Sequence, residues 1–190
     1  MERKKTAEKK GKLTEVIILP EGVNGEIEGN EIILKKDGLE SRKKVDLLKI
    51  KLSKREREII IESDRQTKRE RRMIGTIKAH ILNMLNGLDK KFVYKMEICY
   101  LHFPMTVTID KEKGEIVIKN FLGENKPRIA KILQNVDVKV EKNIIVVESH
   151  DKEAAGQTAA NIEKTTKIKN RDRKKFQDGI FMTEKCGEAI

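Results

Sequence analysis

The chain has 190 residues, of which 42 are Lys or Arg and 31 are Asp or Glu, so its formal net charge is +11 and its isoelectric point is about 9.5. A strongly basic surface attracts polyanions. Tyr and Phe make up only 4% of the chain and Trp is absent, which argues against a platform that stacks successive bases of a single strand, because such a platform needs several rings. The length has room for one large or two small domains.

Several classes of protein are disfavoured by what the sequence lacks. The two cysteines, Cys99 and Cys186, are far apart and have no metal-ligand spacing, so neither a metal site nor a disulfide framework is expected. No apolar run approaches the length of a membrane span, and the N-terminus has no apolar signal core. We therefore expect a cytoplasmic protein with no membrane partner. Residues 1–12 carry six basic and two acidic side chains, which predicts a disordered tail, with an ordered RNA-binding arm as the alternative.

Residues 13–88 have the pattern of a first α+β domain. Short apolar or alternating runs between turn signals predict strands at 16–19, 25–28, 31–36, 39–45, 48–52 and 59–61. Gly29-Asn30 and Asp37-Gly38 are typical two-residue hairpin loops. From Gln66 to Leu85, apolar residues recur at three- and four-residue steps, which predicts an amphipathic helix. Gly87 is expected to end that helix as a left-handed cap.

Residues 89–190 repeat this order as a second α+β domain. Strands are expected at 92–100, 105–109, 115–119, 146–149 and 180–183, and a helix at 152–166. Glu115–Lys119 copies Glu31–Lys35 at an offset of 84, and Val146–Ser149 copies Ile60–Ser63 at an offset of 86. The sequence therefore predicts an α+β fold made of two tandem copies of one small domain, each an antiparallel sheet with one packed helix. Chance similarity of short Ile/Val runs is the alternative.

The positive charge is concentrated in separate segments. Arg42–Arg57 holds eight basic and two acidic residues, Arg65–Arg72 five and one, and Lys164–Phe176 seven and one. The last segment also contains Asn and Thr, which can hydrogen-bond RNA at short range. Phe176 is expected to anchor it to the domain core. The candidate RNA-binding residues are Lys164, Lys167, Lys169, Asn170, Arg171, Arg173, Lys174 and Lys175, with a merely solvated face as the alternative.

Local signatures of catalysis are absent. The sequence has no phosphate-binding Walker pattern, and His80, His102 and His150 have no HExxH or triad-like neighbours. We therefore predict a non-enzymatic protein with no catalytic residue, cofactor or metal. The alternatives are an RNA-processing enzyme, since catalytic groups gathered from distant segments leave no local motif, and a general basic RNA-binding protein.

Three segments of the second half carry a family resemblance. The first comprises Tyr94-Lys95-Met96 and Tyr100-Leu101-His102-Phe103-Pro104, the second is Asn120-Phe121-Leu122-Gly123-Glu124, and the third, within Thr165–Lys185, contains Lys169-Asn170, Arg171-Asp172, Lys175-Phe176 and Asp178-Gly179-Ile180. In this order they resemble the universal large-subunit ribosomal protein family called L-six in bacteria and L-nine in eukaryotes, in its archaeal and eukaryotic form. The resemblance runs from about Leu13 to Lys185.

The resemblance implies two copies of a small α+β domain that dock on large-subunit ribosomal RNA near the sarcin–ricin loop and stalk base. It implies neighbouring large-subunit and stalk-base ribosomal proteins as partners, with translation factors nearby, and no catalytic residue or cofactor. Lys95 and His102 join the candidate RNA-binding residues on this basis, while packing is the alternative for Tyr94, Phe103 and Pro104. The family is usually richer in Arg after the second motif than Lys126–Lys131 is here, so the contacts of those arginines are not carried over.

Overall fold

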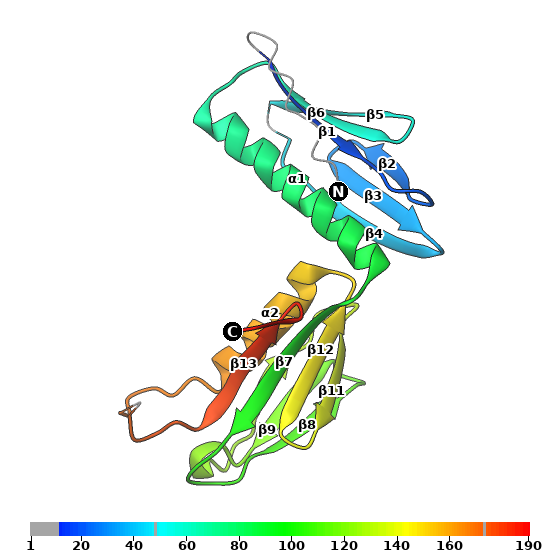
Figure 1. Cartoon of the computed structure of the whole chain (residues 1–190). Helices are drawn as coiled ribbons and strands as arrows, with labels where there is room; N and C mark the ends of the chain where they lie inside the picture. The colour runs from blue at the N-terminus through cyan, green and yellow to red at the C-terminus, as the bar shows by residue number, and fades with distance from the viewer. Residues whose placement is uncertain (1–11, 48, 173) are drawn as a thin grey trace. The chain divides into compact units, whose positions relative to one another are not determined.

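The chain folds as two compact α+β units, the first ending at Asp89 and the second beginning at Lys90 (Figure 1). The structure is a computed structural model and describes residues 12–47, 49–172 and 174–190. Except for Lys12, the predicted N-terminal tail lies outside the described residues, as do Leu48 and Arg173. Within the described chain, no helix is long and apolar enough to cross a membrane.

The first unit consists of two three-stranded antiparallel sheets and one helix. Its elements are β1 (Leu13–Ile18), β2 (Asn24–Glu28), β3 (Glu31–Lys36), β4 (Leu39–Lys44), β5 (Ile50–Arg55), β6 (Glu58–Ser63) and α1 (Lys68–Asp89). The sheet orders are β1-β6-β5 and β2-β3-β4. Both predicted hairpin loops are confirmed, since Glu28 pairs with Glu31 and Lys36 pairs with Leu39. The predicted helix and strands are also confirmed, with bounds that differ by a few residues.

The second unit also contains six strands followed by a helix, and in addition a 3-10 turn and two C-terminal strands. They are β7 (Phe92–Cys99), β8 (Thr106–Asp110), β9 (Glu115–Lys119), the 3-10 turn η1 (Phe121–Gly123), β10 (Arg128–Lys131), β11 (Asp137–Glu141), β12 (Ile144–Ser149), α2 (Lys152–Thr165), β13 (Gly179–Lys185) and β14 (Glu188–Ala189). Its sheets have the orders β10-β9-β8 and β11-β12-β7-β13-β14. The sequence patterns did not predict β10, β11 or β14.

The strand orders of the two units match, which confirms the predicted duplication. The copied segments Glu31–Lys35 and Glu115–Lys119 lie in β3 and β9, and each of these is the central strand of its three-stranded sheet. The other sheets correspond as β5-β6-β1 and β11-β12-β7. Among the described residues, β13 and β14 have no counterpart in the first unit, and β13 extends the second unit's sheet beyond β7.

A buried serine at the end of one strand explains the repeated Glu-Ser signature. Ser63 ends β6 and Ser149 ends β12, and each is 2% exposed. The Ser63 hydroxyl accepts the backbone N–H of Arg65 at 3.3 Å, and the Ser149 hydroxyl accepts that of Asp151 at 3.1 Å. Such a bond to the residue two positions on turns the chain out of the strand. The same hydroxyl therefore directs both copies from sheet to helix.

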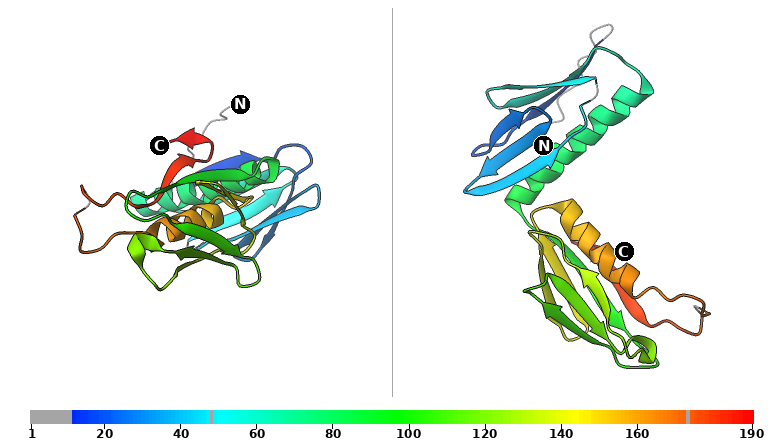
Figure 2. Two further views of the ribbon diagram at one scale, coloured as in Figure 1. Left: turned by 90° about the horizontal axis from the view of Figure 1, so that it is seen from below. Right: turned by 180° about the vertical axis from the view of Figure 1, so that it is seen from behind.

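Each helix lies against the sheets of its own unit (Figure 2). It buries one apolar stripe in the hydrophobic core of that unit. In α1 the predicted positions Ile74, Ile77, Ile81, Met84 and Leu85 are buried, and in α2 so are Ala155, Ala159 and Ile162. The predicted end of α1 is wrong. Gly87 lies inside the helix with no positive φ, because Leu88 extends the buried stripe and α1 continues to Asp89.

Candidate nucleic-acid interface

The basic segment of the second unit, Lys164–Phe176, begins with the last two residues of α2 and continues as an exposed loop toward β13; we call it the basic loop. It leaves the end of α2 and returns as β13, as the orange trace in Figures 1 and 2 shows. The candidate residues Lys164, Lys167, Lys169, Asn170, Arg171, Lys174 and Lys175 are all exposed, whereas Arg173 lies outside the described residues. The structure thus gathers most of the predicted site on one loop.

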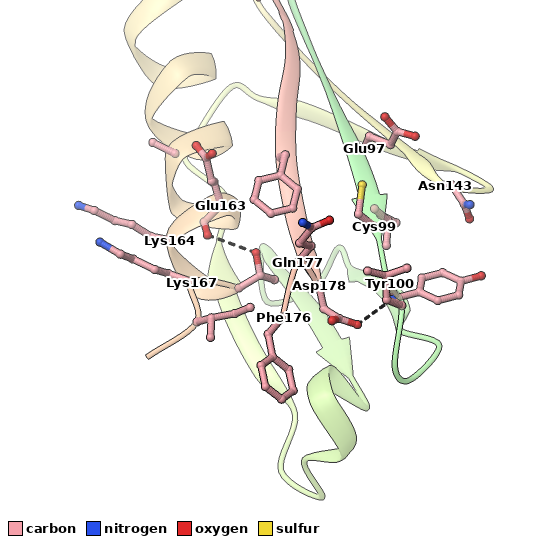
Figure 3. A pocket seen from close by; sticks show the side chains of 16 residues that line it. Glu97, Cys99, Tyr100, Asn143, Glu163, Lys164, Lys167, Phe176, Gln177 and Asp178 are labelled. Atoms are coloured by element: carbon pink, nitrogen blue, oxygen red, sulfur yellow. Dashed lines mark hydrogen bonds between the residues drawn. The ribbon is translucent and has the colours of Figure 1, made fainter. Parts of the chain in front are cut away.

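The start of this loop is fixed to the body of the unit. Thr166, which is 3% exposed, accepts the backbone N–H of Ile180 at 3.0 Å and donates its hydroxyl proton to the carbonyl of Glu163 at 3.2 Å. Ile168 packs against the hydrophobic core. Alternate side chains of this stretch therefore hold the backbone, while Lys164 and Lys167 extend to the same side of the end of α2 (Figure 3).

The middle of the loop is shaped by local backbone geometry. Asn170 has a φ of 57°, in the left-handed region that Asn tolerates better than most residues. The Asp172 carboxylate accepts the N–H of Lys174 at 2.9 Å, and its carbonyl accepts the N–H of Phe176 at 3.0 Å. The one acidic residue of the segment thus forms a turn, which leaves the Lys174 and Lys175 side chains exposed.

The end of the loop is fixed by a buried carboxylate. Asp178 is 1% exposed, and its Oδ1 accepts the N–H groups of Leu101 and His102 at 2.9 and 3.1 Å. The His102 Nδ1 atom lies 2.7 Å from Asp178 Oδ2. Burial raises the pKa of Asp178, but the hydrogen bonds from the backbone and ring of His102 and from Leu101 outweigh it, so this pKa lies below its ordinary value of 3.8. An ionised Asp178 therefore joins the loop to the segment after β7.

Phe176 holds the loop in a different way from the one predicted. Its ring is half-buried and stacks on His102, with 4.7 Å between ring centroids. The Arg171 guanidinium lies 4.9 Å from the same centroid. The side chain that joins the hydrophobic core is Ile168 rather than Phe176. His102 consequently acts in this structure as a support for the loop, and 37% of its side chain remains exposed.

Arg128 is a structural residue of this region that the sequence patterns did not reveal. Its guanidinium binds both carboxylate oxygens of Glu124, at 2.8 and 2.6 Å, and donates to the carbonyl of Thr165 at 2.7 Å and more weakly to that of Lys167 at 3.4 Å. It also lies 4.2 Å from the centroid of the Phe121 ring. Arg128 therefore connects the Asn120–Glu124 motif to the first residues of the basic loop.

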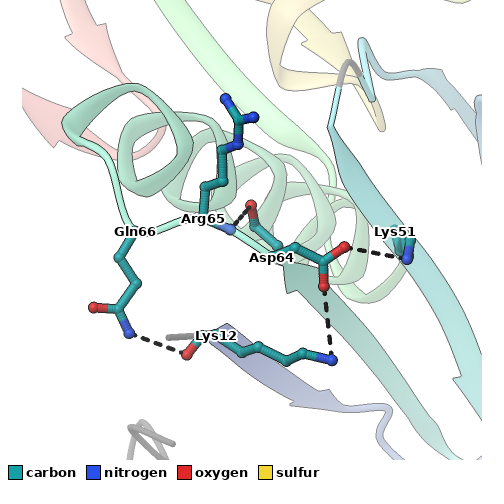
Figure 4. A network of polar contacts seen from close by, with 6 residues as sticks. Lys12, Lys51, Asp64, Arg65 and Gln66 are labelled. Atoms are coloured by element: carbon teal, nitrogen blue, oxygen red, sulfur yellow. Dashed lines mark hydrogen bonds and ion pairs between the residues drawn. The ribbon is translucent and has the colours of Figure 1, made fainter. Parts of the chain in front are cut away.

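The lysines of the loop differ from many cations of the first unit in having no carboxylate partner among the described residues. In the first unit, Asp64 pairs with Lys51 at 3.3 Å and with Lys12 at 3.7 Å (Figure 4), and the Lys51 ammonium, the nearer of the two, lowers the pKa of Asp64 most. Arg42 and Arg57 in the Arg42–Arg57 segment also pair with carboxylates. Unpaired lysines are the more available for phosphate.

Two other sets of basic residues lie outside the loop. Lys95 is half-buried on β7 and pairs with Glu184 of β13 at 2.7 Å, so the structure does not bring it into the loop. The Arg65–Arg72 segment leads into α1, which begins at Lys68, and Arg65, Lys68, Arg69, Arg71 and Arg72 are exposed. Among the described residues these five have no carboxylate partner, which makes the start of α1 a second basic surface.

The Asp178 contacts make a testable prediction about stability. Asp178→Asn should lower the free energy of unfolding of the second unit by about 1–3 kcal/mol at neutral pH, because an amide nitrogen replaces one buried acceptor. The stabilisation from an ionised carboxylate with a lowered pKa is present above about pH 3.8 and is lost as the pH falls through the folded-state pKa. The difference between wild type and variant should therefore shrink in acid.

The measurement is thermal unfolding of both proteins from neutral pH down to about pH 3, across the ordinary pKa of a carboxyl group. Asp110→Asn is the control, because Asp110 is only half-buried and its carboxylate accepts a single backbone N–H, that of Lys113. Equal stability of wild type and Asp178→Asn at neutral pH would contradict the prediction.

The fold and this surface define a class of protein, a duplicated α+β protein whose second domain carries a basic loop. Residues 103–179 match the family of ribosomal protein L6. The large ribosomal subunit protein uL6 of Methanococcus vannielii is 40% identical over 179 residues, which cover 94% of this chain and 97% of that protein. The uL6 proteins of Methanosphaera stadtmanae (44% over 180 residues, 94% and 96% covered) and Methanosarcina mazei (48% over 137 residues, 72% and 77% covered) are also similar. The chain belongs to the ribosomal protein L6 family, as the motifs predicted.

Proposed function

We propose that this protein is a structural constituent of the large ribosomal subunit and binds ribosomal RNA mainly through its Lys164–Phe176 loop. The observation that carries this proposal is the set of exposed lysines without carboxylate partners among the described residues, on a backbone fixed at both ends. Each phosphate neutralised by such a lysine releases counterions and adds to affinity. The relatives named above are large ribosomal subunit proteins, and their names support the same role.

The proposed location is the region of the sarcin–ricin loop and stalk base, beside neighbouring large-subunit and stalk-base proteins and near translation factors, where the protein would support translation. This location comes from the family resemblance. In this role the protein works in the cytoplasm by affinity and shape. The start of α1 is a second surface that such a site can use, because its exposed cations oppose the helix dipole and favour an anion nearby.

The experiment is a direct comparison of RNA fragments. Purified protein is titrated with a large-subunit RNA fragment that contains the sarcin–ricin loop and stalk base, and with a fragment of equal length from another part of the same RNA. We expect tighter binding to the first fragment, with intact RNA recovered from both. Equal affinity for the two fragments would contradict the proposed location, and shortened RNA would favour a processing enzyme instead.

A further inference from the structure

A pocket of about 940 Å³ opens in the second unit between the end of α2, the end of β7 and the start of β13 (Figure 3). Its volume lies within the range of small-ligand sites, roughly 300–1,000 Å³. The chain has only two Tyr and five Phe, yet Tyr100, Phe176 and Phe181 all line this pocket. Tyr100 is 42% and Phe181 38% exposed. The Phe176 ring is partly covered by His102, so the exposed rings of this pocket are those of Tyr100 and Phe181. Exposed apolar surface that lines a hollow indicates a binding site.

The lining of the pocket carries both lysines and carboxylates, and Glu163 lies beside Lys164 on the side of the basic loop (Figure 3). Lys164 and Lys167 belong to its lining at the start of the basic loop, whereas Glu97 and Asn143 lie on the opposite side in Figure 3. With two ammonium groups and one carboxylate, the side of the basic loop keeps a net positive charge that attracts a phosphate, whereas the Glu97 carboxylate repels it. The Glu97 carboxylate can only accept hydrogen bonds, and the Asn143 amide oxygen can accept them too. This side therefore suits an uncharged, planar group that donates N–H hydrogen bonds.

We propose that this pocket holds one unpaired nucleobase of ribosomal RNA, with the adjoining phosphates on Lys164 and Lys167. The inference rests on the proposed RNA-binding function and adds contact with a base to contact with phosphate. Proteins recognise RNA sequence mostly at unpaired bases, which stack on aromatic side chains and hydrogen-bond through their edges. An apolar peptide would pack against the rings equally well. It would leave Lys164 and Lys167 without an anionic partner, so the two lysines favour a nucleotide.

The experiment uses the full chain and large-subunit ribosomal RNA. Ultraviolet cross-linking followed by mass spectrometry of the peptides should find a nucleotide attached to Tyr100, Phe176 or Phe181. Tyr100→Ala and Phe181→Ala should each weaken RNA binding about tenfold, which is typical for the loss of one stacked base. The slope of log affinity against log salt should not change, because no phosphate contact is removed.

Phe103→Ala is the matched control, since Phe103 is 47% exposed and close in sequence to Tyr100 but does not line the pocket. The Phe181 ring packs so closely on Gly179 that the glycine has no room for a Cβ atom. Because Phe181→Ala removes this packing, its stability is checked by thermal unfolding. Tyr100 follows β7 in a loop and gives a second, independent variant.

Three results would overturn the inference while leaving the proposed function intact. The first is RNA binding by Tyr100→Ala and Phe181→Ala that equals that of the control. The second is cross-linking confined to the lysines of the basic loop. The third is a loss of binding to a neighbouring ribosomal protein, with RNA affinity unchanged, which would assign the pocket to a peptide. A wild-type chain without salt-dependent RNA binding would instead overturn the proposed function, and the inference with it.

Discussion

Replacing five lysines of the basic loop by alanine is expected to reduce the log–log salt slope of ribosomal RNA binding by about 4 units, at about 0.7–0.9 for each phosphate contact. The five are Lys164, Lys167, Lys169, Lys174 and Lys175, which are exposed and have no carboxylate partner among the described residues. Arg171 is left in place because it packs on Phe176. Exposed substitutions of this kind usually change stability by less than about 0.5 kcal/mol each, so both units should remain folded.

The matched control removes the same charge from cations that already have carboxylate partners. The control variant has alanine at five positions, Lys35, Arg42, Lys51, Arg57 and Lys91. In the wild type these cations pair, in that order, with Glu26, Glu40, Asp64, Glu21 and Asp137. Affinities are measured at several salt concentrations, with circular dichroism as the check on folding. An equal fall in slope for the two variants would mean that net charge alone, rather than the loop, determines binding.

Arg128→Met is expected to destabilise the second unit by about 2–3 kcal/mol, because it removes a charge-assisted pair and leaves partly buried acceptors without a donor. The side chain is 27% exposed, and its partners include both Glu124 oxygens and the Thr165 carbonyl. We also expect faster hydrogen exchange at residues 165–169. RNA affinity should fall while the salt slope is retained, because Arg128 positions the loop and its donors already have partners within the protein.

Two further variants separate geometry from charge. Arg128→Lys keeps the charge but cannot bind Glu124 with two parallel hydrogen bonds, so it should recover only part of the stability. Lys113→Met is the control for a surface pair, because Lys113 lies 3.8 Å from Asp110 and is 73% exposed, and such pairs contribute about 0–1 kcal/mol. Unchanged exchange at residues 165–169 in Arg128→Met would show that Arg128 does not hold the loop.

The duplication could be predicted from the sequence because its signals are local. Ile59, Ile60 and Ile61 form a buried run, and the apolar residues of α1 keep a helical period, so the side-chain pattern alone specifies the element. The basic loop was predictable for the same reason, since its charge is continuous in sequence.

What the sequence did not reveal depends on edges and on distant contacts. β10 and β11 are short edge strands. Arg128–Lys131 has charged residues only at its two ends and is too short to show a period, whereas Asp137–Glu141 alternates charged and apolar residues, which is a strand pattern that our prediction missed. Arg128 meets the carbonyl of Thr165 across 37 positions of sequence, and the pocket joins residues of β7, α2 and β13. The periodicity of apolar residues along the chain does not reveal such contacts between distant residues. The end of α1 was missed because burial of Leu88 outweighs the usual preference of glycine for a helix end.

The pairing of β13 with β7 sets the order in which the molecule can be completed during synthesis. Gly179 pairs with Cys99 across 80 positions, and closing so long a stretch of chain is slow compared with local folding. The first unit ends at Asp89 and is compact, so we expect it to fold while the rest is still being made. The basic loop lies between α2 and β13, so both of its ends are held only after β13 has joined the sheet. The surface proposed to hold RNA is therefore among the last parts of the second unit to form.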